Sequence, residues 1–215
     1  MPLICLVRHG QASAGAEDYD VLSGPGRAQA AAVGRELARR GLRDPHLVSG
    51  TLVRQRDTAR LLADAAGFGG PLHQDPRWNE YDHLGLLARY APASGRTASE
   101  QDRLDHALLA WTRGPGTTGG ETWAAFSGRV AAGLAELPAA LGRGRDAVVV
   151  TSGGVLAALC GALLSLPGEG IAALHRVTVN ASVTTLAVGA SGTTLLTFNE
   201  HAHFAGDGRR LLTYR

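Results

Sequence analysis

The chain has 215 residues, of which 45% are hydrophobic and 19% charged, a composition that indicates one folded globular domain and excludes a disordered chain. The formal net charge is +2, and the 21 basic residues are all arginines scattered along the sequence, which argues against a nucleic-acid-binding protein. No apolar run is long enough to cross a membrane, and the N-terminus lacks the charged segment of a secretion signal, so we expect no membrane partner.

The two cysteines, Cys5 and Cys160, both lie in apolar runs. A disulfide framework is therefore not expected, and two buried thiols suit the reducing conditions of the cytoplasm. We predict a cytoplasmic protein.

Two kinds of segment alternate along the chain. Apolar runs rich in β-branched residues predict strands, and they occupy residues 3–7, 46–50, 147–152, 182–188 and 193–198, with a weaker candidate at 71–75. Helical spacing marks the segments at residues 26–41, 54–67, 97–114, 122–141 and 154–166. Thr97 or Ser99 is a candidate N-cap for the third helix, because acidic residues follow in its first turn.

This alternation predicts a three-layer α/β/α sandwich with a mostly parallel central sheet. Gly-Ala-Ser-Gly at 189–192 is typical of a hairpin, which makes the last strand an antiparallel edge. No linker or repeat divides the chain, so residues 1–215 are expected to form a single domain. Residues 85–120 are rich in loop-forming residues and predict a partial lid, within an insertion around residues 85–125.

The first predicted strand ends in Arg8, His9 and Gly10. Ligands of open α/β sheets bind beyond the carboxyl ends of the strands. At that place an arginine can clamp phosphate or carboxylate oxygens, a histidine can act as nucleophile or base, and a glycine lets the backbone approach a ligand. A surface Arg-His pair in a turn is the alternative.

Three later segments add residues at the same edge of the sheet. Arg54 lies in the first turn after the second strand and can point back toward the strand ends, whereas Arg56 and Arg60 are expected to be solvated helix charges. Glu80 follows the weak strand among aromatic residues, where burial would raise its pKa and fit it to act as an acid, unless it is an ordinary loop residue.

The fourth strand runs into Ser152 and Gly153 at the start of a helix. Backbone N–H groups at such a helix start form an anion site. Ser152 can cap this helix, face the ligand, or do both through different groups.

The ordered set Arg8-His9-Gly10-Gln11, then VRQRDTA, NEYD and VVVTSGG, resembles the histidine phosphatase superfamily, also called the phosphoglycerate mutase-like family. GGETWAAFSGRV (119–130) and FNEHAHF (198–204) resemble further segments of that family, so the resemblance spans nearly the whole chain.

The resemblance implies phosphoryl transfer through a phosphohistidine on His9, without a metal or other cofactor. Arg8 and Arg54 would clamp the phosphoryl oxygens, with Gln11 and Gly153 in the same phosphate site. Glu80 would protonate the leaving group and later deprotonate water. The expected substrate is a small phosphomonoester or a phosphoprotein.

The resemblance breaks at Ser152, where the family has a second histidine that donates to the phosphoryl group. We expect a loss of about tenfold in rate from this change. His83 and His203 are candidates to supply a replacement imidazole, while His175 and three other histidines have no context that suggests a role. His201 and His203 are only weak support for a metal site.

Three functions remain open. A phosphatase is the leading hypothesis, a catalytically weak or inactive phosphate-binding pseudoenzyme is the alternative, and the short C-terminal tail makes a phosphoglycerate-type mutase less favoured. The sequence is compatible with a monomer or a homodimer.

Overall fold

A computed structural model of the protein describes residues 1–13, 20–90, 99–114, 119–142 and 144–214. Its strands are β1 (Leu3–Arg8), β2 (His46–Ser49), β3 (Leu72–Gln74), β4 (Ala147–Thr151), β5 (Val183–Gly189) and β6 (Gly192–Glu200). Its α-helices are α1 (Gly24–Arg39), α2 (Val53–Ala66), α3 (His83–Tyr90), α4 (Glu100–Arg113), α5 (Trp123–Leu141), α6 (Gly153–Leu163) and α7 (Gly168–Val177). Three 3₁₀ helices, η1 (Pro76–Trp78), η2 (Ala202–Phe204) and η3 (Gly206–Leu211), complete the described elements.

The strands form one sheet in the order β3-β2-β4-β1-β5-β6. The first four of these are mutually parallel, and β5 and β6 are antiparallel additions joined by a hairpin. The predicted fold class is therefore confirmed, together with all six predicted strands and the hairpin at the edge.

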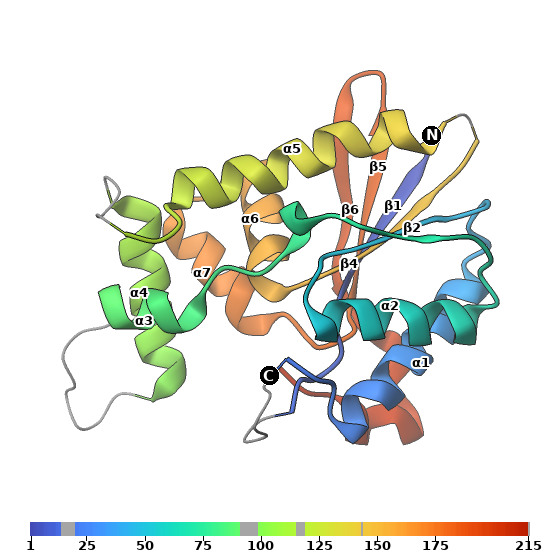
Figure 1. Cartoon of the computed structure of the whole chain (residues 1–215), viewed down its shortest axis with the longest axis horizontal. Helices are drawn as coiled ribbons and strands as arrows, with labels where there is room; N and C mark the ends of the chain where they lie inside the picture. The colour runs from blue at the N-terminus through green and yellow to red at the C-terminus, as the bar shows by residue number, and fades with distance from the viewer. Residues whose placement is uncertain (14–19, 91–98, 115–118, 143, 215) are drawn as a thin grey trace.

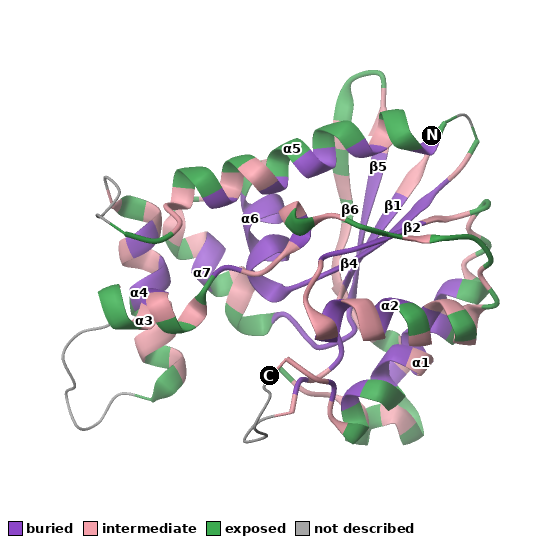
Figure 2. Ribbon diagram, in the orientation of Figure 1, coloured by how far each residue is buried: buried purple, intermediate pink, exposed green. Residues whose placement is uncertain are grey.

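Helices cover both faces of the sheet. Successive side chains of the central strands point to opposite sides, so each face contributes apolar residues to a core of its own. In β1, Ile4 and Leu6 belong to the core shared with α5 and α6, whereas Cys5 and Val7 belong to the core shared with α1 and α2. Figure 1 shows α5 along one side of the sheet and α1 and α2 along the other. Figure 2 shows the consequence, with buried central strands and helices whose outer surfaces are exposed.

Local sequence signals explain where several helices begin. Ser23 caps α1 by accepting from the Gly26 N–H, and Ser99 forms a capping box with Asp102 at the start of α4. Two helices, α3 and α7, were not predicted. The expectation of a loop-rich segment from residue 85 is wrong at its start, where α3 continues to Tyr90; residues 91–98 and 115–118, on which the rest of the predicted lid depends, lie outside the described residues.

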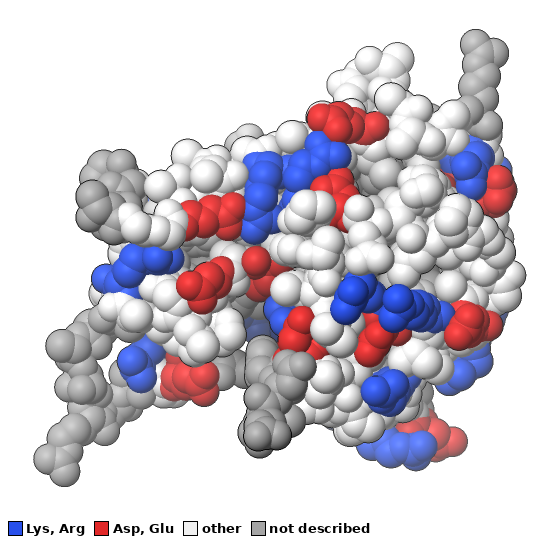
Figure 3. All heavy atoms as spheres, viewed as in Figure 1, with Lys and Arg blue, Asp and Glu red and all other residues white. Residues whose placement is uncertain are grey.

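The composition also led to predictions about the cysteines, membrane-spanning segments and the distribution of charge. Both cysteines are buried and unbridged. Within the described ranges, no helix combines the length and apolarity that crossing a membrane requires. On the face seen in Figure 3, arginines and acidic residues are interspersed rather than separated into areas of one sign.

The register of the central strands places the site. Arg8 at the end of β1 lies opposite Thr151 at the end of β4, and the His9 N–H donates to the Thr151 carbonyl at 2.8 Å. The segments that follow these two strands are therefore neighbours at the carboxyl edge of the sheet.

Candidate active site

A cavity of about 350 Å³ opens at the carboxyl edge of the sheet. This volume lies within the usual range for small-molecule sites. Its lining residues are Arg8, His9, Gln11, Ala12, Arg54, Glu80, Tyr81, His83, Leu87, Glu100, Gln101, Leu104, His175, Arg176, Asn180 and Tyr214. Six of the nine residues that the sequence predicted for the site are in this set: Arg8, His9, Gln11, Arg54, Glu80 and His83.

His9 follows β1 directly and is 7% exposed. Its Nδ1 lies 2.7 Å from the Gly10 carbonyl, a contact in which the ring N–H must be the donor. This bond assigns the proton to Nδ1 and leaves the lone pair on Nε2. The Arg54 Nε–H donates to that Nε2 at 3.2 Å. The ring is therefore fixed with its nucleophilic nitrogen toward a guanidinium.

Arg54 lies in the first turn of α2, where it is buried. Asp20 holds it there, because one carboxylate oxygen accepts from Arg54 Nη1 at 2.6 Å and the other accepts from the Val53 N–H at 2.7 Å. Asp20 thus caps the start of α2 and orients the guanidinium. This role leaves no signal in the sequence, since Asp20 lies 33 residues before Val53.

Arg8 lines the same cavity from the end of β1. Its Nη1 donates to the carbonyls of Thr178 and Tyr214, the latter at 2.8 Å. These bonds tie the guanidinium to the loop after α7 and to the C-terminal segment. The C-terminal segment is thereby part of the wall of the cavity.

Gly10 and Gln11 connect β1 to α1. A Cβ on Gly10 would lie 2.3 Å from the Gly26 carbonyl oxygen, and a Cβ on Gly26 would lie 2.1 Å from the Gln11 carbonyl oxygen. A close approach to the first turn of α1 therefore requires glycine at position 10. Gln11 remains at the cavity, where its side-chain oxygen accepts from Ser23 Oγ at 3.0 Å.

Glu80 occupies the N-terminus of α6. Its Oε2 accepts from the Gly154 N–H at 2.9 Å, and its Oε1 accepts from the Tyr81 N–H at 3.2 Å. A Cβ on Gly154 would lie 2.3 Å from Oε1, so the missing side chain at position 154 makes room for the carboxyl. A protein carboxyl, with its affinity for the positive end of a helix, therefore takes part of the predicted anion site.

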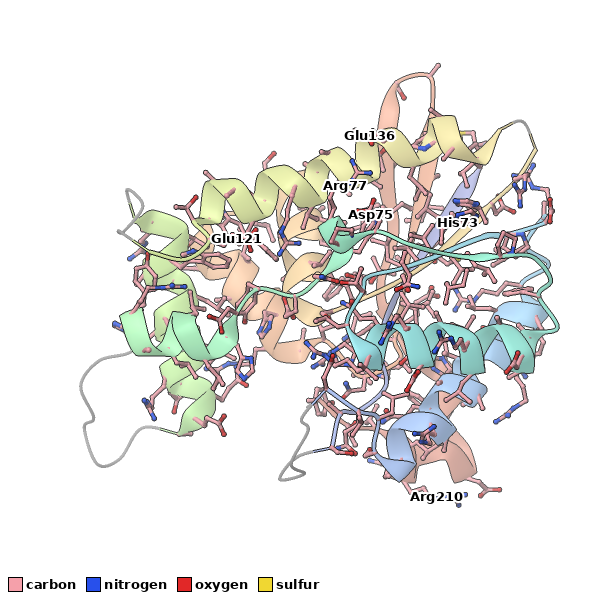
Figure 4. All side chains as sticks on the ribbon, in the orientation of Figure 1. His73, Asp75, Arg77, Glu121, Glu136 and Arg210 are labelled. Atoms are coloured by element: carbon pink, nitrogen blue, oxygen red, sulfur yellow. The ribbon has the colours of Figure 1, made fainter. Side chains whose placement is uncertain are left out.

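The backbone that leads to Glu80 is held from α5. Arg129 Nη1 donates to the carbonyls of Arg77 and Asn79, both at 2.8 Å, while Glu121 accepts from the other side of the same guanidinium at 2.6 and 3.0 Å. Figure 4 shows Glu121 near the start of α5 and Arg77 at the segment beside that helix. The glutamate and the arginine of GGETWAAFSGRV, Glu121 and Arg129, thus act together on the position of Glu80.

The surroundings shift the pKa values of His9 and Glu80 in opposite directions. Burial, reinforced by Arg54 and Arg8, holds the pKa of His9 well below its ordinary value. Burial raises the pKa of Glu80, against the opposing effects of the Gly154 N–H and Arg54. A neutral imidazole and a carboxyl that retains its proton to higher pH are the two forms that nucleophilic attack and leaving-group protonation require.

The structure does not bring Ser152, Gly153 or His203 to the cavity lining. Ser152 is fully buried at the N-cap position of α6, where its Oγ accepts from Gln55 Nε2 at 2.8 Å and makes no capping bond. His203 donates from Nε2 to the Ala181 carbonyl at 3.0 Å, and its ring packs on Phe204 on the α1 side of the sheet. Each side chain is held away from the cavity by a hydrogen bond to a local partner, although the buried Nδ1 of His203 has no hydrogen-bond partner among the described residues.

Two other histidines do line the cavity. His83 is the first residue of α3 and lines the cavity, as expected of a candidate site residue. His175, in the last turn of α7, was assigned no role from the sequence, yet its Nε2 lies 3.3 Å from the Tyr81 hydroxyl within the lining.

The family model of the histidine phosphatase superfamily (branch 1) matches residues 4–201. The chain belongs to the histidine phosphatase superfamily. The resemblance stated from the motifs is confirmed at the level of this family.

Relatives in the family carry both mutase and phosphatase names. The probable phosphoglycerate mutase GpmB of Salmonella paratyphi C is 31% identical over 173 residues, which are 76% of this chain and 75% of the relative. The structure of a mycobacterial glucosyl-3-phosphoglycerate phosphatase in complex with VO3 superposes with a TM-score of 0.67 at 29% identity, covering 94% of this chain and all of that one. The structure named mycobacterial hydrolase 1 has the same TM-score at 32% identity, covering 94% of this chain and 99% of that one.

Proposed function

We propose that this protein is a phosphatase that hydrolyses phosphomonoesters through a phosphohistidine on His9. The observation that carries the proposal is the convergence, on one cavity, of a buried neutral imidazole, two arginines and a carboxyl with a raised pKa. In the first step His9 Nε2 attacks phosphorus, the bond from phosphorus to the ester oxygen breaks, and Glu80 gives its proton to the departing oxygen. In the second step Glu80 takes a proton from water, whose oxygen attacks phosphorus, and the bond to Nε2 breaks to release phosphate.

Arg54 and Arg8 neutralise the transferred phosphoryl group in this scheme. Transition states of phosphoryl transfer spread charge over the equatorial oxygens, so catalysis depends on positioning and on fixed positive charge. Two guanidiniums beside the nucleophile supply both. Gln11 and His83 line the same cavity and are proposed to contact the phosphoryl oxygens. Gly153, where a Cβ would lie 3.6 Å from Arg8 Nε, is proposed to belong to the same phosphate site.

The far wall of the cavity favours a phosphatase over a mutase. Its described residues include Leu87, Leu104 and Glu100, and its third arginine, Arg176, is paired with two carboxylates of α4. Such a wall suits a leaving group that is partly apolar and carries no second anion. The name of GpmB keeps mutase activity as the second candidate, and conversion of 3- to 2-phosphoglycerate without phosphate release would favour it.

The deciding experiment measures phosphate release from p-nitrophenyl phosphate in the presence of a chelator. His9→Ala should lower turnover by at least about 10³-fold, because the covalent route is lost. The matched control is His106→Ala, a change at an exposed histidine of α4. Phosphate release that survives His9→Ala would overturn the proposal, and binding of phosphate without any release would favour the pseudoenzyme.

A further inference from the structure

We infer that His175, supplied by α7, is a catalytic residue that donates a hydrogen bond to the transferred phosphoryl group. This inference rests on the proposed function. It concerns the imidazole donor that the family resemblance places at position 152, where this chain has serine. It assigns a role to an element that the sequence did not predict. The substrate it serves is any phosphomonoester that places its phosphorus before His9.

The side chain of Ser152 cannot serve as this donor from where it lies. It is fully buried, its Oγ is bonded to Gln55, and that same Gln55 amide donates to the Trp78 carbonyl at 3.0 Å. The amide thus fastens Ser152 to the core between α2 and η1. A donor toward the ligand must come from a side chain that reaches the cavity from elsewhere.

His175 reaches the place where such a donor is needed. A Cβ built on Gly153 would lie 3.6 Å from His175 Nε2 and also 3.6 Å from Arg8 Nε, both at ordinary contact distance. The imidazole and the guanidinium therefore lie together over the first residue of α6. Because position 153 carries no side chain, nothing of that residue separates them from the cavity.

Tyr81 orients the ring of His175. Its hydroxyl lies 3.3 Å from Nε2, while its backbone N–H donates to Glu80. A separation of 3.3 Å is long for a hydrogen bond of this kind, so Nε2–H can donate to a phosphoryl oxygen instead at little cost. Tyr81 consequently links the orientation of the donor to the position of the acid.

The packing of α7 fixes the approach of this ring. Arg176, the next residue, pairs with Asp105 and Asp102 of α4, and the Thr178 hydroxyl donates to the Leu174 carbonyl at 2.7 Å. The carbonyl of Thr178 then accepts from Arg8. The end of α7 is therefore tied both to α4 and to the phosphate-binding arginine.

The test compares His175→Leu with His175→Gln. Leucine keeps apolar volume but removes the donor, whereas the glutamine amide can restore one. We expect His175→Leu to lower kcat for p-nitrophenyl phosphate by about 10- to 100-fold and to weaken inhibition by inorganic phosphate and orthovanadate, because a preorganised donor contributes about 10²-fold or more. Glutamine should recover part of both losses.

His106→Leu, an exposed change on α4, is the matched control and should alter neither readout. Wild-type kcat and wild-type inhibition constants in His175→Leu would overturn the inference. If the wild-type protein shows no His9-dependent release, the proposed function fails, but the dissociation constant of inorganic phosphate still decides the role of His175. Equal phosphate affinity in wild type and His175→Leu would then refute it, and weaker affinity would support it.

Discussion

The side chain that is missing at position 154 decides where the Glu80 carboxyl can lie. Gly154 is the second residue of α6, and its N–H donates to Glu80 Oε2. A methyl group there would lie 2.3 Å from Oε1 and 2.4 Å from the ring of Tyr81. Both distances are too short for a real contact, so the carboxyl would have to leave its place and the buried ring of Tyr81 would have to shift as well.

We therefore predict that Gly154→Ala mimics loss of the acid. General acid catalysis contributes about 10²- to 10⁴-fold, so kcat should fall by about 10²-fold on alkyl phosphates and less on p-nitrophenyl phosphate, whose leaving group needs little protonation. Helix propensity by itself favours alanine. Steady-state kinetics on the two substrate classes makes the measurement.

Gly128→Ala is the control for this change, because a Cβ at that exposed position of α5 meets no atom within 4 Å. Its activity should match that of the wild type. An equal loss on alkyl and aryl phosphates in Gly154→Ala would indicate a general distortion of the site instead of displacement of the acid.

Individual site residues differ in how far sequence can reveal them. Arg8 ends β1, His9 follows it, and Arg54 lies in the first turn of the helix after β2. Because the carboxyl ends of parallel strands converge, these places along the chain predicted the proximity of the three residues. Asp20 and His175 had no such signal. Each acts through a contact across the fold, and neither follows a strand of the sheet.

At the scale of elements, the segment after β1 and the first turn of α1 approach each other closely beside the site. Gly10 and Gly26 allow two backbones to meet, and a Cβ on Gly26 would fall 2.1 Å from the Gln11 carbonyl oxygen. Backbone cannot rotate away as a side chain does. The segment that carries His9 would have to move relative to α1.

Gly26→Ala should accordingly destabilise the protein. Overpacking of this kind costs about 1–3 kcal/mol, which for a chain of this length lowers Tm by roughly 3–10 °C. The comparison is Gly24→Ala, two residues earlier in the same helix, where no atom lies within 4 Å of the added Cβ. Thermal unfolding of the two variants gives the answer, and equal Tm values would show that this close approach has room to relax.

The helix α7 shows why some helices could not be predicted from the sequence. The segment of α7 opens with Pro167, Gly168 and Gly170, residues typical of a loop, and only its later half has apolar residues at helical spacing. Tertiary contacts with α4 and α6 stabilise it as a helix. Because α7 was missed, the two cavity residues that it carries, His175 and Arg176, were missed as well.

At the scale of the whole molecule, the alternation of strands and helices was sufficient to predict the layers of the fold. The weak strand at 71–75 is a three-residue β3, held by pairing with β2 rather than by its own apolar pattern. What the pattern could not supply is which candidate side chains turn away from the site. His203 is the clearest case, because its place in the sequence suggested a ligand contact and its place in the structure is a packing contact.

The packing role of His203 makes the stability of the whole fold depend on pH. Burial lowers the pKa of His203 to about 4 from its ordinary 6.5, so between these values the unfolded chain binds a proton that the folded protein does not. The contribution to stability is therefore complete above pH 6.5 and is lost as pH falls toward 4. Since one pKa unit corresponds to about 1.4 kcal/mol, this residue should reduce the free energy of unfolding by at most about 2 kcal/mol between pH 7 and pH 5.

The variant His203→Gln keeps an amide donor for the Ala181 carbonyl and removes the titration. Urea unfolding at pH 7 and pH 5 should show a smaller loss of stability for this variant than for the wild type. The lowered pKa of His9 acts in the same direction and the raised pKa of Glu80 in the opposite one, but both are present in each protein and cancel in the comparison. The control His106→Gln should retain the full wild-type loss of stability between pH 7 and pH 5. If His203→Gln shows that same loss, protonation of His203 does not destabilise the wild-type fold and the prediction is wrong.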